Sequence, residues 1–67
     1  MKLYRYLTGP DDQAFCHRIT AALNRGWSLH GGPTLTYDAE RKRVIAGQAI
    51  VKEAPGEYTP DTDLSAQ

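Results

Sequence analysis

The chain has 67 residues, a formal net charge of zero and a single cysteine. This length allows one domain, and one cysteine excludes the disulfide framework that stabilises many small secreted domains. No run approaches the roughly 20 apolar residues of a membrane-spanning helix, and the first residues lack the apolar stretch of a signal peptide. We therefore expect a cytoplasmic protein that does not associate with membranes.

The zero net charge conceals an asymmetry along the chain. All eight Lys and Arg residues lie within residues 1–52, against four acidic residues, whereas residues 53–67 contain four acidic residues and no base. The second segment is also rich in turn-forming residues and has no apolar pattern. We therefore divide the chain into one α/β domain, residues 1–52, and a flexible acidic tail, residues 53–67. The tail either acts as a solubilising segment or folds back and screens the basic body.

The first half of the domain predicts a strand followed by a helix. Residues 2–8 are dense in Tyr and Leu without Gly or Pro, which is typical of a strand. The helix is expected over about residues 10–25, with Pro10 in its first turn and Gly26 as the left-handed residue after its end. Trp27 would then pack back on the last turn. The apolar stripe with the helical period consists of Phe15, Ile19, Ala22 and Leu23.

Two further strands are expected after the helix. The first begins at Trp27, is interrupted by Gly31-Gly32-Pro33 and resumes over residues 34–37; because Pro33 cannot donate a ladder hydrogen bond, this is an edge strand or a bulge. Residues 44–52 are almost continuously apolar, which is typical of a central strand covered on both faces. The sequence therefore predicts an α+β fold, β-α-β-β, with one helix packed on a three-stranded sheet in the order 1-3-2.

One helix covers only one face of such a sheet. The cleaner apolar row of the third strand, expected to face the helix, consists of Ile45, Gly47, Ala49 and Val51. The other row would lie open, accompanied either by Leu3 and Leu7 or by Tyr4 and Tyr6. An exposed apolar patch of this kind marks an interaction surface, and two-fold pairing is its commonest use. The possible interface residues are Leu3, Leu7, Val44, Ala46, Gln48 and Ile50.

A set of positions within residues 3–52 matches the pattern of a known family. These positions are Tyr4-Arg5, Leu7-Thr8-Gly9, Phe15-Cys16, Leu23-Asn24, Gly26-Trp27, Leu29, Gly31 and Gln48-Ala49. In them the chain resembles the small bacterial family catalogued as domain of unknown function 1737. The resemblance omits the tail. It implies a short bacterial protein without an assigned activity, and it supplies no functional residues.

Candidate chemical groups are sparse. Cys16 and His17 are adjacent, but neighbouring helical residues point about 100° apart and do not face each other, so Cys16 is interpreted as a small buried hydrophobe. The spacing of cysteine, histidine and aspartate matches no zinc pattern. A buried amide needs partners, so Gln48 is expected to bond across a dimer axis, to neighbouring backbone or to a ligand. We predict no catalytic residue, no metal site and no cofactor.

Two functions follow from this pattern. The first is a non-enzymatic protein-interaction module that forms a homodimer through its open sheet face and possesses an unknown protein partner. The second is a module that binds single-stranded nucleic acid, with sheet aromatics for base stacking and a basic rim for the phosphates. The nucleic-acid contacts would be Tyr4, Arg5, Tyr6, Tyr37, Arg43 and Lys52.

Overall fold

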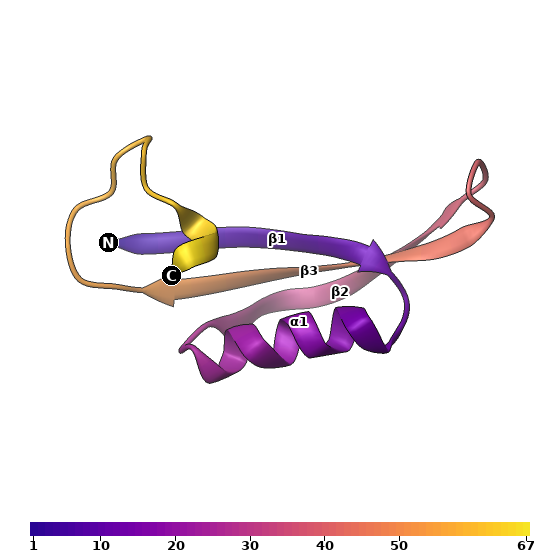
Figure 1. Ribbon diagram of the computed structural model, residues 1–67, viewed down its shortest axis with the longest axis horizontal. Coiled ribbons are helices and arrows are strands. Elements are labelled where there is room, and N and C mark those ends of the chain that lie inside the picture. The colour runs from indigo at the N-terminus through magenta and orange to yellow at the C-terminus, as the bar shows by residue number, and fades with distance from the viewer.

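The computed structural model describes residues 1–67 and contains one α-helix on one side of a three-stranded sheet (Figure 1). In chain order the elements are β1 (Lys2–Pro10), α1 (Gln13–Asn24), β2 (Ser28–Asp38), β3 (Arg43–Glu53) and a short 3-10 helix, η1 (Leu64–Ala66). β3 lies between β1 and β2 and is antiparallel to both. The predicted α+β fold, β-α-β-β with strand order 1-3-2, is therefore confirmed.

The helix begins later than the sequence pattern indicates. Pro10 still belongs to β1, where it pairs with Ile45, and the backbone N–H of Asp11 donates to the carbonyl oxygen of Val44 over 3.0 Å. Asp12 then caps α1, because its carboxylate accepts a 2.9 Å hydrogen bond from the backbone N–H of Phe15. Pairing with β3 thus holds the chain extended for three residues beyond the expected start.

The helix ends as the sequence predicts. Gly26 has φ +98°, and its N–H donates to the carbonyl of Leu23 over 3.2 Å, while the N–H of Trp27 donates to that of Ala22 over 3.1 Å. These two bonds form a Schellman motif. The motif turns Trp27 under the helix, where only 3% of its surface remains exposed.

The core lies between α1 and the helix-facing side of the sheet. It consists of Leu3, Leu7, Ala22, Trp27, Ile50 and Ala54, with Met1, Phe15, Ile19 and Leu64 packed against it. Ile50 is fully buried at its centre. The row of β3 that faces the helix is therefore the one with Ile50, and the prediction that the row with Ala49 and Val51 faces it was wrong.

The bulge in β2 explains why a glutamine lies on the helix side. The pairing of β2 with β3 shifts register between His30 and Thr34, which leaves carbonyl groups of β2 without ladder partners. Gln48 supplies a donor there: its Nε2 lies 3.3 Å from the carbonyl oxygen of Gly31 and 3.4 Å from that of His30, both in β2, and 2.9 Å from that of Ala49 in β3 itself. Of the three alternatives for this amide, the structure shows bonding to neighbouring backbone.

The C-terminal segment returns along β1 and ends near the N-terminus (Figure 1). The N–H of Ala54 donates to the carbonyl of Met1 over 2.9 Å, Leu64 packs against the core, and Lys52 Nζ donates to the main-chain oxygen of Gln67 over 2.6 Å. The flexibility of residues 53–67 stays a prediction. In the structure this segment folds back against the domain.

The β2–β3 hairpin continues beyond the ends of β1 and α1 (Figure 1), and the molecule is 42 Å long but only 24 and 20 Å in its other dimensions. On this arm, residues 37–44, Tyr37 and Val44 are exposed by 62 and 38%. The single α-helix, of 12 residues, is too short to cross a membrane.

Candidate functional site

The sheet face turned away from α1 is the open face, and it is the first candidate site. Strand alternation together with the register places on it Tyr4 and Tyr6 of β1, Ile45, Gly47, Ala49 and Val51 of β3, and Ser28, His30, Thr34 and Thr36 of β2. The two tyrosines are exposed by 55 and 46%. This face therefore has a small-residue centre flanked by aromatic and polar side chains.

A hydrogen bond crosses the middle of the open face. The hydroxyl groups of Tyr6 on β1 and Thr34 on β2 lie 2.5 Å apart, which ties the two edge strands together over β3. Gly47 makes this possible, because a Cβ there would lie 2.5 Å from Tyr6 Oη and 2.7 Å from Thr34 Oγ1. The ring of Tyr6 is thus held against the sheet, whereas Tyr4 forms no side-chain hydrogen bond.

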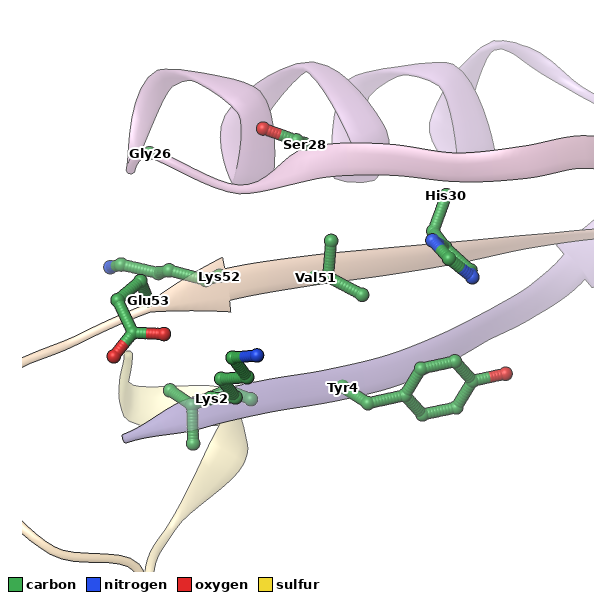
Figure 2. A pocket seen from close by; sticks show the side chains of 9 residues that line it. Lys2, Tyr4, Gly26, Ser28, His30, Val51, Lys52 and Glu53 are labelled. Atoms are coloured by element: carbon green, nitrogen blue, oxygen red, sulfur yellow. The ribbon is translucent and has the colours of Figure 1, made fainter.

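A wide hollow of about 640 Å³ begins beside Tyr4 at the end of the open face. Figure 2 shows Tyr4 of β1 and His30 of β2 projecting on either side of Val51. Lys2 and Glu53 border the hollow at the sheet end. The hollow combines apolar side chains with a phenol, an imidazole and charged groups at its rim.

The residues predicted to form the interface lie elsewhere. Leu3, Leu7, Ala46, Gln48 and Ile50 are at most 6% exposed and face α1. Only Val44 is exposed, on the arm. The assignment of these residues to the open face was wrong because it placed the row with Gln48 outward, and the tyrosine row of β1 occupies that face instead. Self-association itself stays a prediction.

The six residues predicted to contact nucleic acid do not gather on one surface. Tyr4 and Tyr6 are on the open face, whereas Arg5 and Lys52 lie on the other side of the sheet, each 5.9 Å from the centre of the Trp27 ring. Tyr37 and Arg43 are on the arm, and these two residues are remote from both groups. No single stacking platform with a basic rim is formed.

A family model described as a domain of unknown function (DUF1737) matches residues 1–53. The chain belongs to this family. The match covers β1, α1, β2 and β3, and it ends before the segment that carries η1. It confirms the predicted family membership. Neither a curated protein nor a solved structure matches the chain.

The remaining chemical groups of this DUF1737 domain are dispersed. Cys16 is exposed, not buried as expected, and the ring of His17 bonds to the Gln13 amide over 3.3 Å and not to the thiol. No three His, Cys, Asp or Glu side chains lie together in a way that could hold a metal ion.

Sequence reasoning missed one group of side chains. Arg5, Arg18 and Arg25 line a second, smaller hollow between β1 and α1. The available signal was the spacing of Arg18 and Arg25, because residues seven apart are two helical turns apart and share a face.

Proposed function

We propose that this DUF1737 domain is a non-enzymatic interaction module of the bacterial cytoplasm, and that it pairs with a second copy of itself through the open face. The observation that supports this most is the one-sided packing of the sheet. Trp27, the apolar side of α1 and Leu64 all belong to the core on the other side. Val51 and Ile45, on the open face of the central strand, are covered only in part.

The composition of the open face fits a protein surface. Tyrosine is enriched at interfaces because its ring offers a large apolar area while its hydroxyl remains hydrogen-bonded. A standard interface takes about 800 Å² from each partner, which is a sixth of the 4886 Å² exposed by this chain. Two copies stacked face to face would cover both apolar rows of β3, one with α1 and one with the partner.

A matched pair of tyrosine variants tests the proposal. Tyr4 and Tyr37 both project from edge strands and are exposed by 55 and 62%, but Tyr4 lies on the open face and Tyr37 on the arm. Solution mass would be measured by light scattering and sedimentation over a range of concentrations. We expect the unaltered chain and Tyr37→Lys to form the same dimer, and Tyr4→Lys to be a monomer, because it places an unpaired charge within the contact surface.

Two results would contradict the proposal. If the unaltered chain stays monomeric at all concentrations, self-association is excluded. A dimer that survives Tyr4→Lys but is lost in Tyr37→Lys assigns the contact to the arm instead of the open face. Circular dichroism of both variants shows whether each retains the fold, which is expected because both side chains are exposed.

A further inference from the structure

The hollow between β1 and α1 is lined by three arginines and by no acidic residue. Its volume is about 200 Å³. The positively charged side chains come from Arg5, Arg18 and Arg25, and the floor consists of Leu7, Ala21, Ala22 and Trp27. We call this site the arginine hollow. It lies on the side of the sheet opposite to the open face.

The sequence builds the arginine hollow from two spacings. Arg18 lies in α1 and Arg25, seven residues later, is the C-cap residue of that helix; the small Ala21 and Ala22 lie between them in the sequence and line the same hollow. Arg5 comes from the helix-facing row of β1 and pairs with Ile50 of β3. Arginine side chains from β1, from α1 and from the residue that caps α1 thus line one hollow.

These charges lack acidic partners. The two ion pairs of the structure join the amino group of Met1 to Glu53 and Arg41 to Asp38, and α1 contains no Asp or Glu from which an i±4 pair could form. Arg18 donates to the carbonyl of Thr8 over 2.8 Å, and Arg5 lies over the Trp27 ring. Both groups are therefore held in place by neutral contacts, and neither forms an ion pair.

We propose that the arginine hollow binds a phosphate group. Guanidinium is a planar fork that donates two parallel hydrogen bonds to an oxyanion. A phosphate has enough acceptor oxygens for all three guanidinium groups. Its double negative charge also offsets the positive charge of the three arginines better than a single carboxylate does. The group is either free phosphate or a phosphoryl group on a larger molecule, and the two sources are separated by the test below.

The C-terminal segment places one carboxylate in the field of Arg5. Asp63 precedes η1, and the pKa of its carboxyl is lowered by hydrogen bonds from the side chain and backbone of Ser65 and from the backbone of Ala66, and least by the charge of Arg5. Asp63 therefore lies within electrostatic reach of one member of the arginine hollow. Replacing Asp63 with asparagine removes this charge and is expected to strengthen phosphate binding.

The fluorescence of Trp27 reports on the site directly, because Trp27 is the only tryptophan of the chain and lines the hollow. Sodium phosphate would be titrated at constant ionic strength against sodium chloride, and the Nε resonances of the arginines followed by NMR. We expect a saturable change with phosphate. Arg25→Gln should weaken binding about tenfold, which is the effect of one charge-assisted hydrogen-bonded pair.

Arg41→Gln is the matched control, since Arg41 lies in the hairpin turn and outside the arginine hollow. Its affinity should equal that of the unaltered chain, and Asp63→Asn should bind more tightly. A short oligothymidylate separates the two sources: binding tighter than that of free phosphate identifies a phosphodiester chain, and weaker binding identifies free phosphate or a phosphomonoester. No saturable change in fluorescence or in the arginine resonances, or an equal loss in Arg25→Gln and Arg41→Gln, overturns the proposal.

Discussion

Replacing Gly47 with alanine tests the bridge that Tyr6 and Thr34 form across the open face. The backbone at Gly47 has no positive φ, so alanine is allowed there and would by itself favour a strand by roughly 0.5–1 kcal/mol. Its Cβ, however, would lie 2.5 Å from Tyr6 Oη, 2.7 Å from Thr34 Oγ1 and 2.8 Å from Tyr6 Cζ. Moving the ring breaks the hydrogen bond and forces new rotamers, which typically costs about 1–3 kcal/mol.

The effect should be large for a chain of this size. A single core of this kind rarely supplies more than about 3–5 kcal/mol, and in small domains each kcal/mol shifts the melting temperature by about 4–8 °C. Urea unfolding followed by Trp27 fluorescence, together with thermal melts, would give the change in the free energy of unfolding for Gly47→Ala. We expect a clear loss of stability in the unaltered background.

The decisive comparison is the same substitution in a Tyr6→Ala background. There the ring is absent and the Thr34 hydroxyl can turn away, so Gly47→Ala should be neutral or stabilising. The difference between the two backgrounds is the coupling energy of the pair, expected at about 1–3 kcal/mol. An equal loss of stability in both backgrounds would refute the reasoning, because the clash would then not involve Tyr6.

Three further predictions follow from the core and the two turns. Ile50→Asp should prevent folding, because it places an unpaired charge at the fully buried centre of the core, and circular dichroism would show the loss of the native spectrum. Gly26→Ala should cost about 1 kcal/mol through its φ of +98° alone, since the added Cβ meets Lys52 Cε at an ordinary 3.6 Å; a thermal melt measures this. The carboxylate of Asp63 should stabilise the C-terminal turn above its ordinary pKa of 3.8 and lose this contribution as the pH falls through its lowered pKa, which the NMR resonances of Leu64 would follow.

The strand order and the helix end could be predicted because each depends on a local signal. The long apolar run of β3 identifies a strand with a neighbour on each side, and this places it between β1 and β2. Gly26 followed by Trp27 specifies a Schellman turn with an aromatic residue that packs back. Neither conclusion requires knowledge of distant contacts.

The start of the helix could not be predicted in the same way. Pro10 is suited to a first helical turn, and it is equally suited to the end of an edge strand. The choice depends on the length of β3, because Ile45 and Val44 still have backbone groups that pair with Pro10 and Asp11. A long-range ladder thus overrides a local preference, and Asp12 becomes the cap.

The arginine hollow was missed for a different reason. A helix predicted over residues 10–25 would place Arg18 and Arg25 on one face, but the sequence does not show what lies opposite that face. Arg5 joins them only because the odd-numbered residues of β1 face the helix. That orientation was open at the level of sequence, since both rows of β1 contain large side chains.

The choice of which row of β3 faces the helix is linked to Gln48. Hydrophobicity assigns a row that contains glutamine to the open face, and the row with Gly47 and Ala49 to the core. The bulge in β2 reverses this order of preference, because the carbonyl groups of His30 and Gly31 in β2, together with that of Ala49 in β3, give the buried amide its acceptors. A polar residue can then lie under the helix, and the small residues of the other row make room for the ring of Tyr6.

This reversal also determines what kind of interface the open face can form. A row of leucine and isoleucine would give a continuous apolar surface of the type found in obligate dimers. The observed face offers Tyr4, His30 and a tyrosine already bonded to Thr34, so it is more polar than such a surface. The observed face can remain exposed in a folded monomer and still bury apolar area on pairing. We therefore expect a concentration-dependent equilibrium between monomer and dimer, in which Tyr4 contributes more than any buried residue of β3.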